Sequence, residues 1–76
     1  MTKRIDGAVY DTQSSTMDKK FTYGAPGDAA GYEETLYITF DGRYFIYTNG
    51  GARSKYPHED ITPIAREEVR GWIMSH

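Results

Sequence analysis

The chain has no cysteine among its 76 residues, so it can form neither a disulfide scaffold nor a zinc site built on thiolates. Its two histidines, His58 and His76, lie far apart in the sequence and form no His-rich cluster. The longest apolar run is residues 44–47, too short for a membrane span or a signal-peptide core. We therefore expect a cytoplasmic protein with no metal and no cofactor.

An excess of charge of one sign is also missing. Nine Lys and Arg residues oppose eleven Asp and Glu residues, for a net charge of −2, which argues against direct nucleic-acid binding. Seven Tyr, three Phe and one Trp are too many aromatic residues for a disordered tail. A chain this short predicts one soluble domain, residues 1–76, with a thin core.

Residues 3–10 carry the signature of a tight hairpin. Asp6-Gly7 stands between two short β-prone runs, and Asp-Gly favours a type I′ turn because both central positions need a positive φ. We expect Ile5 and Val9 to contribute to the core.

Two readings remain open for residues 11–23. A short helix could begin at Asp11 or Thr12, where the side chains can cap it. A strand over residues 18–23 competes with it, and the alternation of residue types favours the strand. Residues 24–32 contain Gly24, Gly27 and Gly31 with one proline, a composition that predicts a packed loop.

The central hairpin over residues 34–47 is the best-defined element. Residues 34–40 and 43–47 are rich in β-branched and aromatic residues, and Asp41-Gly42 separates them. A two-residue turn would pair Phe40 with Arg43, Ile38 with Phe45 and Leu36 with Tyr47. The opposite face would then carry Tyr37 and Tyr44, so the sheet would have one apolar and one tyrosine-rich face.

The C-terminal region predicts a short edge strand and a helix. Residues 59–63 fit a strand with Ile61 inward, and Ala65, Val69, Trp72 and Ile73 form one apolar helical stripe. The helix could begin at Thr62-Pro63 or at Ala65. Gly71 predicts the close approach of a backbone or a large ring. The fold class is therefore α+β: a small antiparallel sheet of about three to five strands with one C-terminal helix packed on a face.

No motif in the chain carries catalysis. Gly50-Gly51, followed by Arg53, Ser54 and Lys55, could bind an anion, but the spacing is not that of a P-loop. The simpler interpretation is a loop, within residues 48–58, whose glycines take a positive φ. Glu33 and Glu34 are strand neighbours that point to opposite faces and cannot share a reacting atom. We expect no enzyme.

The tyrosines indicate a contact surface. Tyr37 and Tyr44 lie on the predicted tyrosine-rich face, and Tyr47 and Tyr56 flank the glycine loop. Tyrosine is enriched at protein–protein interfaces. The same residues could equally be half-buried in a small domain, whereas base stacking would need more basic residues than this chain has.

A series of short motifs resembles a known group of proteins. The motifs are YDT at 10–12, EETLY at 33–37, GRYF at 42–45, GG at 50–51, SKY at 54–56, IxP at 61–63 and ExxxxW at 67–72. Their order resembles small, mostly uncharacterised bacterial proteins of conjugative elements and prophages, in which a longer segment replaces residues 57–60. The resemblance implies an accessory protein that binds a host protein, as the small and often acidic anti-CRISPR proteins do.

The expected function is therefore a non-enzymatic inhibitor or modulator of a bacterial defence protein, such as a CRISPR–Cas effector subunit. Acidic side chains would pair with basic residues that normally hold nucleic acid. The predicted partner-binding residues are Asp28, Glu33, Glu34, Tyr37, Tyr44, Arg53, Lys55 and Tyr56. One alternative is a small homodimeric structural or interaction module with no defence role, paired through an exposed strand edge. Another is an enzyme or a small-ligand binder that uses the glycine loop and His58.

Overall fold

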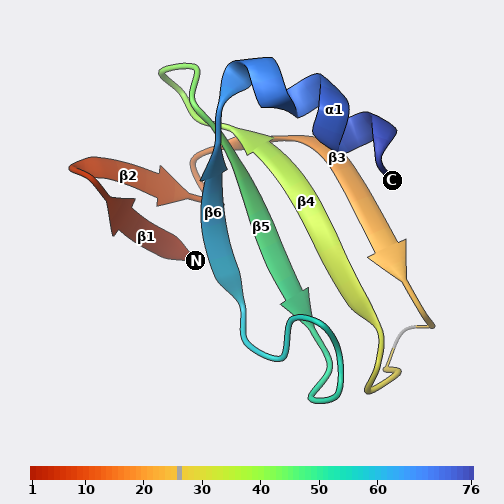
Figure 1. Cartoon of the computed structure of the whole chain (residues 1–76). Helices are drawn as coiled ribbons and strands as arrows, with labels where there is room; N and C mark the ends of the chain where they lie inside the picture. Colours follow the sequence, from red (N-terminus) through yellow and green to blue (C-terminus); the bar gives the residue numbers. More distant parts are fainter. Residues whose placement is uncertain (26) are drawn as a thin grey trace.

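The computed structural model describes residues 1–25 and 27–76, and within them the strands form two antiparallel sheets. The strands are β1 (Thr2–Ile5), β2 (Ala8–Asp11), β3 (Thr16–Tyr23), β4 (Tyr32–Ile38), β5 (Tyr44–Gly50) and β6 (Asp60–Ile64). A 3-10 turn, η1 (Arg66–Glu68), leads into the helix α1 (Val69–Met74). Strands β3, β4, β5 and β6 are neighbours in that order, and β1 pairs with β2. The predicted α+β class is confirmed, and the separate hairpin sheet is an addition to it (Figure 1).

The N-terminal hairpin turns where the sequence predicts. Asp6 and Gly7 have φ values of 50° and 79°, and Ile5 pairs with Ala8 across them, as a type I′ turn requires. The expectation for Val9 is wrong, because that side chain is 51% exposed and its neighbour Tyr10 is buried instead. Alternate residues of a strand face opposite sides, and the side that meets the main sheet is that of Tyr10.

Residues 16–23 are strand β3, which confirms the strand interpretation over the helix for this part of the segment. The Asp11 carboxylate accepts a hydrogen bond from the Gln13 backbone N–H at 3.0 Å, so the side chain that could have capped a helix forms a turn instead. A register shift between Met17 and Lys19 interrupts the pairing of β3 with β4.

The central hairpin differs from the prediction by one residue. The observed pairs are Ile38 with Tyr44, Tyr37 with Phe45 and Leu36 with Ile46. Beyond the strand ends, the Thr39 N–H still donates to the Arg43 carbonyl at 2.7 Å, which leaves a three-residue loop, Phe40 to Gly42. In this loop Gly42 has φ 86° and donates its N–H to the Thr39 carbonyl at 3.0 Å. This is the hairpin in which a turn is followed by a left-handed glycine. Phe40 is therefore fully exposed at the tip instead of paired with Arg43.

The shifted register also separates the two tyrosines that were predicted to share a face. Tyr37 stacks on Phe45 with ring centroids 5.1 Å apart, on the face where Phe45, Tyr10 and Ile61 form the core cluster. Tyr44 precedes Phe45 in the strand and so faces the other side. A tyrosine-rich sheet face containing both residues is therefore wrong.

The opposite face of the main sheet meets the C-terminal helix (Figure 1). Trp72 packs edge-on against Phe21 of β3, with ring centroids 5.4 Å apart. Residue Ala65 is extended, with φ −67° and ψ 146°, and is exposed, so the helical region begins after it and β6 continues to Ile64. No described atom from outside its own helical segment lies within 4 Å of a Cβ built on Gly71, so the expected close approach is wrong.

Candidate functional site

The two glycine-rich loops lie against each other at the end of the sheet where β4 begins. The Gly51 N–H donates to the Gly31 carbonyl and the Arg53 N–H donates to the Ala29 carbonyl, both at 2.9 Å. A Cβ on Gly51 would overlap the Ala29 carbonyl. Gly50 and Gly51 are therefore needed because the backbones come close, and the expected positive φ occurs at Gly24 and Gly27 instead.

The same hydrogen bonds occupy the donors that an anion would need. Besides the two N–H groups already paired, the Ser54 hydroxyl donates to the Gly51 carbonyl at 2.7 Å. That hydroxyl also accepts the Tyr56 N–H at 3.2 Å. A phosphate-binding loop works by aiming free backbone N–H groups at the ligand, whereas the N–H groups of Gly51, Arg53, Ser54 and Tyr56 are already bonded within the protein.

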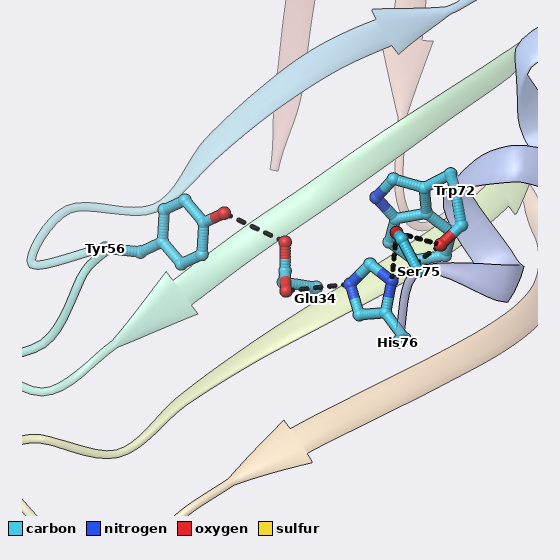
Figure 2. A network of polar contacts seen from close by, with 5 residues as sticks. All are labelled: Glu34, Tyr56, Trp72, Ser75 and His76. Atoms are coloured by element: carbon cyan, nitrogen blue, oxygen red, sulfur yellow. Dashed lines mark hydrogen bonds and ion pairs between the residues drawn. The ribbon is translucent and has the colours of Figure 1, made fainter.

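Glu34 is the centre of a buried polar network beneath these loops. One carboxylate oxygen accepts the Tyr56 hydroxyl at 2.8 Å, and the other lies 2.9 Å from His76 Nε2, as Figure 2 shows. The side chains of Glu34 and His76 are each 9% exposed. Both carboxylate oxygens of Glu34 are therefore engaged within the protein, as is typical of buried polar groups.

His76 links this carboxylate to the helix. Its Nδ1 lies 2.6 Å from the Trp72 carbonyl oxygen, and its Nε2 faces Glu34 (Figure 2). The Ser75 hydroxyl also lies near Nδ1, at 3.3 Å, so both ring nitrogens have polar partners within hydrogen-bond distance. The network therefore joins α1, β4 and the loop of Tyr56.

Six rings form a continuous row over this network, from the helix to the loop that follows β5. Successive centroids are 5.4 Å apart for Trp72 and Phe21, 4.5 Å for Phe21 and His76, 6.4 Å for His76 and Tyr23, 4.5 Å for Tyr23 and Tyr32, and 5.4 Å for Tyr32 and Tyr56. We call these six residues the aromatic row. Its middle is open to solvent, since Tyr23 is 37% exposed.

The surroundings of the row raise the pKa of two of its tyrosines. Burial raises the pKa of Tyr56, and its hydrogen bond to Glu34 raises the pKa further. The pKa of Tyr23 is also raised, by desolvation first and then by the negative charge of Glu34. Lys55 lies 5.4 Å from the centroid of the Tyr56 ring, a cation–π distance. Because both pKa values are raised, Tyr23 and Tyr56 remain neutral hydroxyl donors at physiological pH.

A cleft of about 600 Å³ lies beside the aromatic row. Tyr23 and Tyr32 form part of its wall, together with Thr22, Glu33, Asn49 and the glycine-rich loops. The Glu33 carboxylate lies 3.3 Å from Lys20 Nζ across the strand pair. Thr22, Glu33 and Asn49 are register partners, and their side chains face the side of the sheet opposite to Tyr23 and Tyr32. The cleft therefore adjoins the aromatic row around the end of the sheet and does not lie on one face with it.

The structure brings most of the predicted binding residues to this end of the molecule. Glu34, Lys55 and Tyr56 belong to or adjoin the aromatic row, Asp28 and Glu33 line the cleft, and Arg53 is exposed on the adjoining loop. Tyr37 lies in the core and Tyr44 at the other end of the sheet, so neither adjoins this surface.

Sequence reasoning missed five of the six rings in the row: Phe21, Tyr23, Tyr32, Trp72 and His76. Phe21 and Tyr23 are two residues apart in a predicted strand, so the sequence alone could have placed both rings on one face. The pairing of Tyr23 with Tyr32 follows only from the register.

Within the described residues, no three His, Asp or Glu side chains converge in a way that could hold a metal ion. No helix in that part of the chain is long and apolar enough to cross a membrane. In comparisons with known proteins, the chain matches no family model, no curated protein and no solved structure. The function is therefore argued from the surface itself.

Proposed function

We propose that this chain is a non-enzymatic binding protein that inhibits or modulates a bacterial defence protein, with a CRISPR–Cas effector as its first candidate target. The observation that carries the binding role is the aromatic row beside its cleft, with Tyr23 open to solvent. Tyr and Trp dominate the residues whose truncation costs most at protein interfaces. The defence target is drawn from the motif resemblance alone.

The row is held in place before any partner binds. Glu34 fixes the Tyr56 hydroxyl at 2.8 Å, and Tyr23 and Tyr32 stack on each other at 4.5 Å. Side chains that are already ordered lose less conformational entropy on association. This support favours a role in recognition, because a rigid aromatic surface gives contact area at low cost.

In this proposal, Glu33 and Asp28 are the acidic residues that contact basic residues of the partner. Both line the cleft, whereas the Glu34 oxygens are both engaged internally. A basic residue of the partner would approach Glu33 in competition with Lys20, its present neighbour at 3.3 Å. Complementary charges of this kind mainly raise the association rate and fix orientation.

Inhibition of nucleic-acid cleavage tests the proposal. Purified CRISPR effectors are assayed with increasing amounts of the wild-type protein, of Tyr23→Ala and of Val9→Ala. Val9 is the matched control because it is 51% exposed and lies on the N-terminal hairpin, outside the row.

We expect one effector to be inhibited, at least a tenfold higher inhibitory concentration for Tyr23→Ala, corresponding to about 1.4 kcal/mol, and no change for Val9→Ala. Inhibition of no effector would overturn the defence role. Equal inhibition by Tyr23→Ala would overturn the aromatic row as the contact surface.

A further inference from the structure

The tip of the β4–β5 hairpin presents a phenylalanine that the fold does not use. Phe40 is 100% exposed, whereas its neighbours hold the turn together. The Thr39 hydroxyl donates to the Asp41 carboxylate at 2.5 Å and accepts the Arg43 N–H at 2.9 Å. Phe40 takes part in none of these bonds, so the turn would form equally well with a polar residue at this position.

The turn is also firmly built. Asp41 forms an ion pair with Arg43 at 3.3 Å, and Gly42 supplies the left-handed conformation with φ 86°. An exposed aromatic ring on an ordered turn gains nothing for folding, but it loses little entropy when it enters a pocket. Such a ring is a preformed anchor for an interface.

A groove that fits such an anchor lies directly beside the turn. Its volume is about 370 Å³, and its wall includes Tyr10, Tyr44, Pro63 and Ile64. Gly42 and Arg43 belong both to the turn and to the groove wall. The projecting ring and the apolar hollow are therefore neighbours on one end of the molecule, the arrangement that a twofold contact needs.

The groove wall carries two arginines, Arg43 and Arg66, and the turn carries one carboxylate, Asp41, which pairs with Arg43 of its own turn. Asp41 follows Phe40 in the turn, and Arg66 lies in the groove wall. Within residues 1–25 and 27–76, no carboxylate lies within ion-pair distance of Arg66. A second copy that inserted its Phe40 would bring its Asp41 to the side of the groove where Arg66 is unpaired.

We propose that Phe40 of one copy inserts into the groove of a second copy and receives the partner's Phe40 in return, giving a twofold dimer. The contact joins hairpin tips and covers less than the roughly 800 Å² per partner of a standard stable interface, so the dimer is weak and forms at high protein concentration. Tyr32 and Ile38 bound strand β4, so the aromatic row lies at the opposite end of the sheet and stays free.

Sedimentation velocity over a concentration series tests this proposal, from about 10 μM to about 1 mM protein. We expect the wild-type mass to rise towards twice the monomer mass, and Phe40→Ser and Arg66→Asp to remain monomeric. Val9→Ser, which removes another exposed apolar side chain, and Tyr23→Ala should associate as the wild type does.

Because Phe40 is fully exposed, Phe40→Ser should keep the wild-type melting temperature, which separates lost association from lost folding. A wild-type protein that stays monomeric over the whole range would overturn the proposal and leave the groove to a different protein. Dimerisation of Phe40→Ser at the wild-type concentration would overturn it as well. Neither result bears on the proposed binding role of the aromatic row, which is tested with Tyr23→Ala in the inhibition assay.

Discussion

At the residue scale, two adjacent glutamates have different structural roles. Glu34 is buried and both of its carboxylate oxygens have side-chain partners, whereas Glu33 forms a partly exposed pair with Lys20. We expect Glu34→Gln to lower the free energy of unfolding by about 1–3 kcal/mol, because a buried hydrogen-bonded charge is lost. Glu33→Gln should change it by less than about 0.5 kcal/mol. Urea unfolding measures both, and equal effects would contradict the account.

The glycines give a second matched pair. Gly51→Ala would push a Cβ into the Ala29 carbonyl, so we expect a loss of about 1–3 kcal/mol from overpacking. Gly71→Ala places its Cβ in open space within the helix and should stabilise the protein by about 0.5–1 kcal/mol, since alanine has the higher helix propensity. Thermal unfolding of the two variants should therefore shift in opposite directions.

Tyr47 predicts a loss of stability at high pH. Burial, and then its 2.9 Å hydrogen bond to Glu59, raise the pKa of Tyr47 to about 12 from a usual value of 10.0. Because the folded-state pKa is the higher one, this contribution is complete below pH 10 and is lost as pH rises towards 12. Tyr47→Phe should therefore flatten the decline in unfolding free energy between these pH values. An unchanged decline would contradict this role.

At the scale of elements, hairpins and helix were predictable, but register was not. Asp41-Gly42 fits both a two-residue turn and a three-residue loop that ends in a left-handed glycine. The local sequence is compatible with either connection. Core packing favours the three-residue loop, because the observed register places Phe45 beside Tyr10 and Ile61 in the core and leaves Phe40 exposed.

The candidate site was harder to predict for a related reason. The aromatic row combines β3, the start of β4, the loop that contains Tyr56 and the C-terminal helix. No sequence spacing links segments so far apart, so only Tyr56 was identified. Asp28, Glu33 and Lys55 were also predicted as binding residues. They lie near Tyr56 in the structure because the two glycine-rich loops meet at that end of the sheet.

Tyr10 is the buried anchor of the N-terminal hairpin on the sheet, and Met1, Ile5 and Ala8 pack against the same cluster with partly buried side chains. Tyr10 is 8% exposed and meets Phe45 edge-on with centroids 5.6 Å apart, while an exposed ion pair between Lys3 and Asp60 adds little. Tyr10→Ala should cost about 3 kcal/mol, as for other buried aromatics. Hydrogen exchange should then accelerate in β1 and β2 more than in β4. Retained protection of β1 and β2 would contradict this anchoring role.

At the scale of the whole molecule, the two proposed contact surfaces lie at opposite ends of the four-stranded sheet. Strand β4 leads from Tyr32 in the aromatic row to Ile38, next to the turn that carries Phe40 (Figure 1). At about 3.3 Å per residue this strand separates the two ends by about 20 Å. A dimer formed through Phe40 would therefore present two aromatic rows, and a bivalent partner would bind it more tightly than it binds one copy.

The central claim is that the aromatic row binds a protein, and direct capture tests it most simply. Tagged wild-type protein, Tyr23→Ala and Val9→Ala are each incubated with bacterial lysate supplemented with CRISPR effector complexes, and bound proteins are quantified by mass spectrometry. The account predicts one stoichiometric Cas subunit with the wild type and Val9→Ala, and at least tenfold less with Tyr23→Ala, or about 1.4 kcal/mol. Equal capture by all three proteins, or capture of no protein by the wild type, would contradict it.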